Sequence, residues 1–206
     1  METPEAASGL PPVFDGIEAV CFDAFGTLVE ITNKRQAFMP LFRALSADKR
    51  RELKHRLMRE TQAVDDWPEL LGVEVDDMTR LDVMARITAE VCSVAMRPGM
   101  ADIWNGLRGQ MLKLALCSNL ASPYGTVIRH ILPDVPDVEG LSCKVGAIKP
   151  EPAIYAHVLD GLRLVPEKVL FVGDAARADI EGPQAAGMRA IHVDELISAM
   201  ALQIAR

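Results

Sequence analysis

Aromatic residues are scarce in this chain of 206 residues. They make up 5% of it, although half of the residues are hydrophobic. The interior must therefore be built from Val, Leu, Ile, Ala and Met, and a platform of aromatic rings for stacking nucleic-acid bases is not expected. The formal net charge of −7 argues against a broad polyanion-binding surface, while leaving room for a small basic pocket. We therefore expect no nucleic-acid partner.

Paired cysteines, long apolar runs and a leader-like segment are also missing. Cys21, Cys92, Cys117 and Cys143 lie far apart and form no CxxC pair, so neither a zinc site nor a disulfide framework is predicted. No apolar stretch approaches the roughly 20 residues that cross a bilayer, and the opening METPEAASGLPP lacks the pattern of a signal peptide. These absences predict a cytoplasmic protein with no membrane partner. Residues 1–16 are expected to form a flexible tail.

Short apolar runs recur along the chain, and segments of helix length separate most of them. The runs are IEAVCF (17–22), LKLALC (112–117), VEGLSC (138–143), KVLFVG (168–173) and RAIHV (189–193). Strands that alternate with helices pair in parallel, in a sheet covered on both faces. The pattern therefore predicts an α/β fold with a doubly wound, mostly parallel sheet, whose active groups gather at the carboxyl ends of the strands.

The stretch between the first two runs is too long for one crossover helix. Three of its segments have helical periodicity, namely 35–46, 48–60 and 78–96. An irregular link is expected at 64–77. Pro98 and Gly99 then mark the return to the sheet. We predict a helical insertion over 29–97 and a core made of 17–28 and 98–206.

Polar residues follow or flank the predicted strands at their carboxyl ends. Asp23 follows the first run, Ser118 the second, and Asp174 the fourth, with Asp179 five residues later; Lys149 precedes a predicted helix. Taken singly, each has a structural explanation, as a turn former, a helix cap or a solvated loop charge. Taken together, they place a candidate nucleophile, a hydroxyl, a lysine and paired acids at one edge of a sheet.

This constellation resembles the four motifs of the haloacid dehalogenase superfamily, which here extend from Asp23 to about Met188. The stretches VGAIKPEPAIY and VGDAARADIEGPQAAGM are its most specific parts. The resemblance implies a hydrolase with a Rossmann-like core, and it implies that the insertion at 29–97 is the helical cap of that superfamily.

The acidic residues call for a cation. Asp23, Asp174 and Asp179 would converge near one point, where two like charges at ~4 Å repel by about 1 kcal/mol in water and ~4 kcal/mol at an effective dielectric constant of 20. Hard oxygen ligands suit Mg²⁺, which we predict as the cofactor, with Asp179 acting directly or through water. The resemblance adds the backbone carbonyl of Phe25 as a further metal ligand.

The same residues suggest a reaction. Asp23 would attack a phosphorus centre to give an aspartyl phosphate, while Ser118 and Lys149 spread the developing charge and Lys149 holds Asp23 ionised. The predicted substrate-binding residues lie in the nucleophile loop or follow the second strand, namely Ala24, Gly26, Thr27 and Asn119. The glycine in this set lets the backbone approach the phosphate closely.

Phe25 sets this chain apart from the superfamily's phosphatases, which carry at that position an aspartate that protonates the leaving alcohol. General acid–base catalysis contributes about 10² to 10⁴-fold, so its absence predicts slow turnover or a substrate with a good leaving group. The stretch DAFGTL is instead similar to the start of the family's L-2-haloacid dehalogenases, which attack carbon and use no metal. Asp174 and Asp179, by contrast, favour a metal-dependent phosphatase.

The sequence therefore predicts a Mg²⁺-dependent phosphatase that acts on a small phosphorylated metabolite. One alternative is a 2-haloacid dehalogenase that uses Asp23 on a halogenated substrate. The other is a catalytically inactive phosphate-binding protein that regulates a partner. The cap residues at 29–97 would set selectivity, and the sequence is compatible with a monomer or a homodimer.

Overall fold

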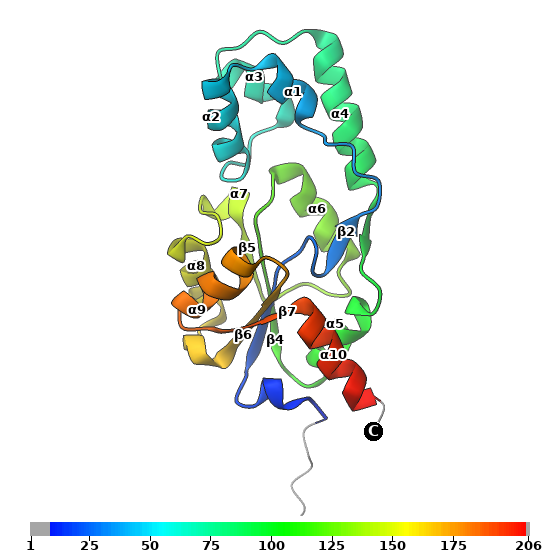
Figure 1. Ribbon diagram of the computed structural model, residues 1–206, viewed down its shortest axis with the longest axis vertical. Coiled ribbons are helices and arrows are strands. Elements are labelled where there is room, and N and C mark those ends of the chain that lie inside the picture. The colour runs from blue at the N-terminus through cyan, green and yellow to red at the C-terminus, as the bar shows by residue number, and fades with distance from the viewer. Residues whose placement is uncertain (1–8, 205–206) are drawn as a thin grey trace, which may run out of the picture.

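Five parallel strands form the centre of the molecule (Figure 1). The computed structural model describes residues 9–204. In sheet order the strands are β5 (Val138–Leu141), β4 (Lys113–Ser118), β1 (Ala19–Phe22), β6 (Val169–Gly173) and β7 (Arg189–His192). Each overlaps one of the predicted apolar runs, and every neighbouring pair is parallel. The predicted α/β fold with a Rossmann-like sheet is therefore confirmed.

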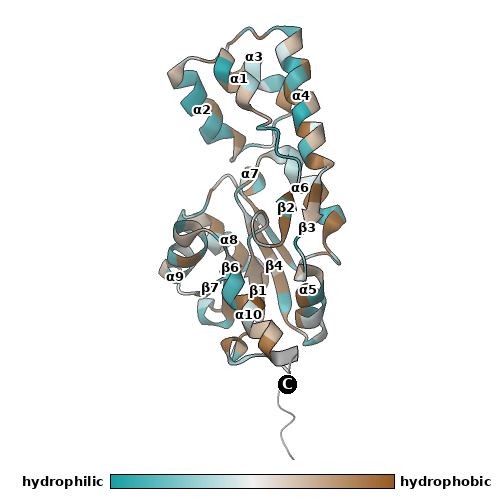
Figure 2. Ribbon diagram, turned by 45° about the vertical axis from the view of Figure 1, so that its right-hand side comes forward, coloured by the Kyte–Doolittle hydropathy of each residue, from teal (hydrophilic) through white to brown (hydrophobic). Residues whose placement is uncertain are grey.

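Side chains of the strands alternate between two apolar layers. On β1, Val20 and Phe22 belong to one layer, whereas Ala19 and Cys21 belong to the other. The first layer is covered by α5 (Met100–Gly109), α6 (Ser122–Ile131) and α10 (Val193–Ile204), and the second by α8 (Pro152–Leu162), with α9 (Gly182–Ala185) beside it. Figure 2 shows the hydrophobic residues concentrated in the strands. The shorter elements are α7 (Ser142–Val145), the 3-10 turn η3 (Pro166–Lys168) and the π-helical segment η4 (Ala176–Glu181).

The segment just before β1 is packed against the core, in place of the flexible tail predicted there. Pro12–Phe14 forms the 3-10 turn η1, and Phe14 is buried. The Arg189 guanidinium donates to the carbonyl oxygens of Val13 (2.7 Å) and Asp15 (2.8 Å). A buried aromatic ring and two charge-assisted hydrogen bonds therefore hold this segment. The part of the prediction that concerns residues 1–8 lies outside the described residues.

A helical cap stands beyond the carboxyl ends of the strands (Figure 1). Its elements are α1 (Met39–Ala44), α2 (Ala47–Leu57), η2 (Val64–Asp66), α3 (Trp67–Leu70) and α4 (Asp77–Val91). The helix predicted over 35–46 is shorter than expected, because it begins only at Met39, with Pro40 in its first turn, where proline favours the start of a helix. The predicted link at 64–77 is not wholly irregular, since it contains η2 and α3, and Trp67 buries its side chain there.

Two strands join the cap to the core. β2 (Val29–Ile31) leaves the core and β3 (Val94–Met96) returns to it, and the two pair antiparallel, with Val29 opposite Met96. The periodicity predicts helix as far as residue 96, but α4 ends at Val91. Backbone pairing with β2, which lies more than 60 residues earlier in the chain, decides the conformation of β3.

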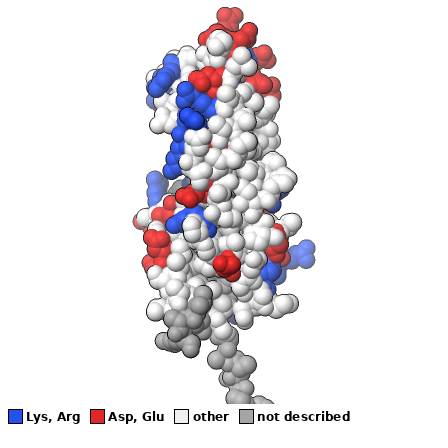
Figure 3. Space-filling model, turned by 90° about the vertical axis from the view of Figure 1, so that its right-hand side faces the viewer, with Lys and Arg blue, Asp and Glu red and all other residues white. Residues whose placement is uncertain are grey.

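Charged side chains are unevenly distributed over the cap. On the face shown in Figure 3, Lys and Arg lie mostly along one edge of the cap, and Asp and Glu gather at its far end. Several of the basic side chains of α2 are already paired; Lys49 and Arg56, for example, both contact Glu52, at 3.4 and 3.6 Å. None of the helices within residues 9–204 combines the length and the apolar character of a membrane span.

Candidate active site

The loop after β1 is a tight turn that fixes Asp23 at the edge of the sheet. The Asp23 N–H donates to the Val172 carbonyl on β6 (2.9 Å), and the Ala24 carbonyl accepts from the N–H groups of Leu28 (2.8 Å) and Val29 (2.9 Å). Gly26 has a φ of +88°, and a Cβ at that position would collide with the Asp174 carboxylate. Only glycine allows both this backbone angle and this close approach.

Lys149 joins two of the predicted acids. Its Nζ donates to Asp23 Oδ1 (2.7 Å) and to Asp179 Oδ1 (2.6 Å), and all three side chains are buried. Burial by itself lowers the pKa of Lys149, but the negative charges of Asp23 and Asp179 outweigh it and raise that pKa above its ordinary value. The lysine therefore stays protonated in the folded protein.

Asp23 experiences opposing influences. Burial raises the pKa of its carboxyl group, Lys149 lowers it, Asp179 raises it again and the Ser118 hydroxyl lowers it, with a net rise. Ser118, the last residue of β4, is itself buried. Lys149 thus supplies the largest contribution that keeps Asp23 ionised, as a nucleophilic carboxylate requires.

Asn119 holds the backbone of Lys149 in place. Its side-chain Nδ2 donates to the Lys149 carbonyl (2.9 Å), and its Oδ1 accepts from the Lys149 N–H (2.7 Å). This reciprocal pair fixes the lysine loop against the end of β4. The Asn119 side chain is therefore a positioning group, and contact of its backbone N–H with a substrate remains a prediction.

The remaining acids lie after β6. Asp179 sits in η4, a short π-helical segment, and its Oδ2 accepts from the N–H groups of Asp174 (3.2 Å) and Ala175 (2.9 Å). Gly173 makes this arrangement possible, because a Cβ there would overlap the Asp179 side chain. Asp174, in contrast, is exposed to solvent.

The acidic cluster fits a hard divalent cation. Asp23, Asp174 and Asp179 each offer an oxygen atom, and these atoms lie within 4.8 Å of one another. Lys149 supplies one positive charge against these three carboxylates and contacts only one oxygen of Asp23. The exposed Asp174 carboxylate and the second oxygen of Asp23 therefore remain as candidate ligands, and carboxylate oxygens are what Mg²⁺ prefers.

The predicted phosphate-binding residues of the nucleophile loop are less accessible than expected. Ala24 and Thr27 are both fully buried, and within residues 9–204 the Thr27 hydroxyl has no hydrogen-bond partner. Any contact of these residues with phosphate is left to their backbone N–H groups and stays a prediction. The loop carbonyls of Gly26 and Thr27 accept from Arg97, a contact that the sequence did not indicate.

Phe25 begins a chain of contacts that leads from the core to the cap. Its ring meets Tyr124 of α6 edge-on, with centroids 5.8 Å apart and an interplanar angle of 89°. The Tyr124 hydroxyl donates to Glu90 of α4, whose other oxygen accepts from the Arg35 N–H (2.7 Å). Burial and Glu90 together raise the pKa of Tyr124. No local pattern in the sequence predicts this chain of contacts.

A second link between cap and core involves Arg59, just after α2. Its guanidinium donates to Glu151 (Nη1 to Oε2, 2.9 Å) and to the Gly146 carbonyl (3.1 Å). Glu151 also accepts from the Ile148 N–H (3.2 Å). Arg59 therefore ties the cap to the loop that carries Lys149.

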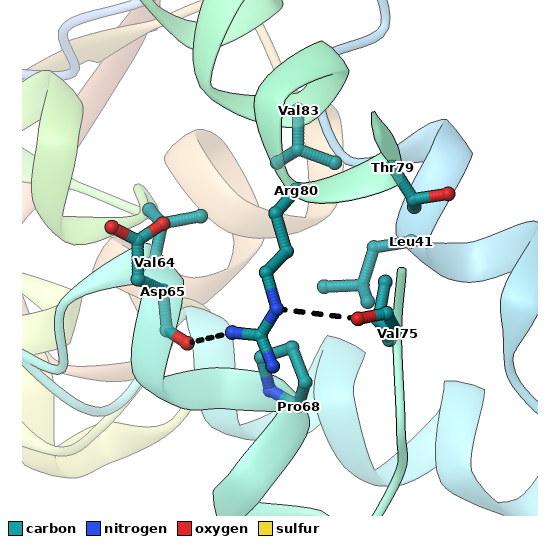
Figure 4. A pocket seen from close by; sticks show the side chains of 8 residues that line it. All are labelled: Leu41, Val64, Asp65, Pro68, Val75, Thr79, Arg80 and Val83. Atoms are coloured by element: carbon teal, nitrogen blue, oxygen red, sulfur yellow. Dashed lines mark hydrogen bonds between the residues drawn. The ribbon is translucent and has the colours of Figure 1, made fainter. Parts of the chain in front are cut away.

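A small cavity lies inside the cap itself (Figure 4). Its volume is about 10 Å³, which is room for about one water molecule. Arg80 points into it and donates to the carbonyls of Asp65 (2.9 Å) and Val75 (3.3 Å). This cavity is a packing feature of the cap and is too small for a substrate.

Comparison with known proteins finds a matching family model and several similar sequences. The sequence matches the family model of haloacid dehalogenase-like hydrolases over residues 17–187. Protein CbbY of Cereibacter sphaeroides is 28% identical over 193 residues, which cover 85% of this chain and 83% of that protein. Phosphatase MT3486 of Mycobacterium tuberculosis is 30% identical over 145 residues, covering 66% and 63%. Because phosphatases occur among the relatives, the comparison favours phosphatase activity over dehalogenase activity.

Solved structures show the same fold. A HAD family enzyme of Bacteroides thetaiotaomicron, bt-2542, in complex with magnesium and inorganic phosphate, aligns with a TM-score of 0.60 at 16% identity, covering 85% of this chain and 93% of that one. CbbY from Rhodobacter sphaeroides in complex with phosphate aligns with a TM-score of 0.57 at 26% identity, covering 85% of each chain.

Proposed function

Because the chain belongs to the haloacid dehalogenase-like hydrolase family, we propose that it is a Mg²⁺-dependent phosphatase that acts on a small phosphorylated molecule through Asp23. The observation that carries this proposal is the cluster of Asp23, Asp174 and Asp179 within 4.8 Å beside the buried Lys149. A dehalogenase that attacks carbon and releases halide needs no cation. Three converging carboxylates, in contrast, need a cation to compensate their negative charge.

In the proposed reaction, an Asp23 oxygen attacks the phosphorus atom, and the bond to the ester oxygen breaks with its electron pair. The resulting aspartyl phosphate is then hydrolysed by water, which regenerates the carboxylate and releases inorganic phosphate. Lys149 and Ser118 would stabilise charge on the transferring oxygens. Phe25 supplies no proton, so the departing oxygen must leave as an anion or take its proton from water.

The metal would be held by side-chain oxygens of Asp23 and Asp174 and by the Phe25 carbonyl. When bound, Mg²⁺ supplies positive charge that neutralises the phosphate oxygens. Asp179 is already engaged by Lys149 and by two backbone N–H groups. We therefore assign it an indirect role, in which it orients the lysine and the loop after β6.

Release of inorganic phosphate from a panel of phosphate monoesters tests the proposal. Asp23→Asn should reduce turnover by at least about a thousandfold, because the nearly isosteric amide does not supply the nucleophile. Asp160→Asn, at an exposed position on α8, is the matched control and should behave as the wild type. Full activity in the Asp23 variant, with a native circular dichroism spectrum, would disprove the assignment.

The dehalogenase alternative rests on Phe25 and is tested by halide release. A panel of 2-haloacids with and without a chelator separates the two chemistries, because the proposed phosphatase should release phosphate only in the presence of Mg²⁺ and should release no halide. Halide release that is indifferent to the chelator would favour the dehalogenase. Tight phosphate binding without turnover of any ester would instead favour a regulatory protein.

A further inference from the structure

A cavity that is partly open to solvent lies between the cap and the core, directly beside Phe25. Its volume is about 220 Å³, and its wall is largely apolar. The core contributes residues of the nucleophile loop and of the region around α6, β2 contributes one residue, and the cap contributes one residue before α1 and one after α2. The apolar lining includes Phe25, Ile31, Leu120 and Tyr124, together with Phe38 and Met58.

Two of the residues that line the cavity are connected to the proposed catalytic groups. Phe25 is two residues from Asp23, and Asn119, which also lines the cavity, holds the backbone of Lys149. A phosphate group at Asp23 would therefore leave the rest of its ester within reach of this cavity. The group that fills it is the one that departs when the phosphorus–oxygen bond breaks.

The polar side chains in the wall are already engaged in hydrogen bonds. The Asn119 side chain is bonded to the N–H and the carbonyl of Lys149, and the Tyr124 hydroxyl donates to Glu90. A sugar or polyol would bring several hydroxyl groups into this space and leave them without partners. Each hydroxyl that loses its water without gaining a partner weakens binding by roughly tenfold. The lining thus selects against hydroxylated leaving groups.

An aromatic ring suits both the size and the chemistry of this space. An apolar cavity of about 150 Å³ binds benzene, so about 220 Å³ is ample for one ring. Phe25 and Phe38 offer ring faces and edges for contact. A phenol also has a pKa of about 10, as the tyrosine side chain does, so its anion leaves far more readily than that of an aliphatic alcohol. Phe25, which provides no general acid, is compatible with such a leaving group.

We propose that the substrate is an aryl phosphate monoester whose aromatic ring occupies this cavity. The proposal rests on the proposed phosphatase function. It adds that the apolar wall selects the ring and that the missing proton donor at Phe25 is tolerated because the leaving group is acidic.

The rate of phosphate release from different esters, measured in the presence of Mg²⁺, distinguishes the effect of the ring on binding from the effect of leaving-group acidity. Phenyl phosphate is compared with hexafluoroisopropyl phosphate, whose alcohol has similar acidity but no ring, and with glucose 6-phosphate. We expect kcat/KM for phenyl phosphate to exceed both by at least about tenfold. As a measurement independent of turnover, benzylphosphonate should inhibit at least roughly tenfold more tightly than methylphosphonate.

A pair of variants tests the cavity wall. Met58→Gln places a polar group of similar length in the wall and should lower kcat/KM for phenyl phosphate by roughly tenfold or more, with inhibition by inorganic phosphate unchanged. Met78→Gln makes the same change on α4, where the methionine is 74% exposed, and should match the wild type.

The outcomes distinguish the two proposals. Equal rates for the phenyl and fluoroalkyl esters, a preference for glucose 6-phosphate, or equal inhibition by the two phosphonates would overturn the aryl assignment while leaving a phosphatase. If no ester is hydrolysed and inorganic phosphate does not bind, the proposed function itself fails.

Discussion

Lys149 and Asp23, 126 residues apart in the chain, meet in the buried interior with Nζ 2.7 Å from Oδ1. The lysine comes from the loop before α8, and the aspartate directly follows β1, at the start of the turn. Since Asp179 accepts from the same Nζ at 2.6 Å, one cation compensates two buried carboxylates. The stability of this buried cluster and the ionised state of Asp23 therefore depend on the same side chain.

Replacing this lysine should destabilise the fold as well as abolish turnover. Removal of one partner from a buried charge pair typically costs about 3 to 5 kcal/mol, so Lys149→Met should lower the free energy of unfolding by about 3 kcal/mol in urea titrations with a chelator present. Lys168→Met is the control, because Lys168 is a partly exposed residue paired with Glu18 at 3.3 Å. It should change stability by less than about 0.5 kcal/mol, and an equal loss in both variants would contradict the role of Lys149.

Gly26 can be tested against a second glycine with a similar backbone angle. Gly26 and Gly99 have φ values of +88° and +79°, but only a Cβ at Gly26 would meet the Asp174 carboxylate. Alanine at either position should cost about 1 to 2 kcal/mol of backbone strain. Only Gly26→Ala should also displace Asp174 and reduce the thermal stabilisation by Mg²⁺, which we expect to be about 2.7 kcal/mol at 100 times the dissociation constant in the wild type. Calorimetric melting with and without Mg²⁺ gives both quantities, and an undiminished Mg²⁺ effect in Gly26→Ala would exclude this placement of the metal.

Phe25→Asp should narrow the gap between aryl and alkyl phosphates. The replacement keeps the backbone carbonyl and adds an acid beside the leaving oxygen, so we expect a gain of up to about tenfold on an alkyl phosphate, equivalent to about 1.4 kcal/mol. Loss of the edge-on contact with Tyr124 should cost about 0.5 to 1.5 kcal/mol of stability. Phe25→Asn loses the same contact without adding an acid, so a similar gain in that variant would show that proton donation is not the cause.

The link between Arg59 and Glu151 should control how firmly the cap is held. Arg59→Gln removes a two-pronged ion pair that is partly exposed, so the global free energy of unfolding should fall by about 1 kcal/mol or less. Amide hydrogen exchange in α2 should nevertheless accelerate by roughly fivefold, because this contact joins the cap to the core. Arg51→Gln, within α2 and with a side chain that is 83% exposed, should leave the exchange unchanged. If both variants exchange at the wild-type rate, Arg59 does not hold the cap.

Local patterns in the sequence predicted much of the architecture. The apolar runs that became β1, β4, β5, β6 and β7 are recognisable because a strand buried on both faces needs continuous hydrophobic residues. The helices α2 and α4 carry their periodicity and their caps in consecutive residues, with Ser46 and Asp76 accepting from the N–H groups three positions ahead. The strand ends placed Asp23, Ser118, Lys149, Asp174 and Asp179 near one edge because parallel strands share the direction of their carboxyl ends.

Contacts between distant segments were decided only by the tertiary structure. The local pattern of β3 predicts the end of a helix, but pairing with β2 makes it a strand. The local pattern around Phe14 predicts a tail, but contacts with Arg189 and the core hold this segment in place. Tyr124 meets Phe25 and Glu90 although nothing in the sequence around any of them signals it. Propensity and periodicity describe neighbours along the chain, whereas these pairs gain their energy from groups that only the folded backbone brings together. Short-range patterns in the sequence thus determined which reactive residues gather at the carboxyl ends of the strands. The apolar cavity beside them was formed only by the packing of the cap against the core.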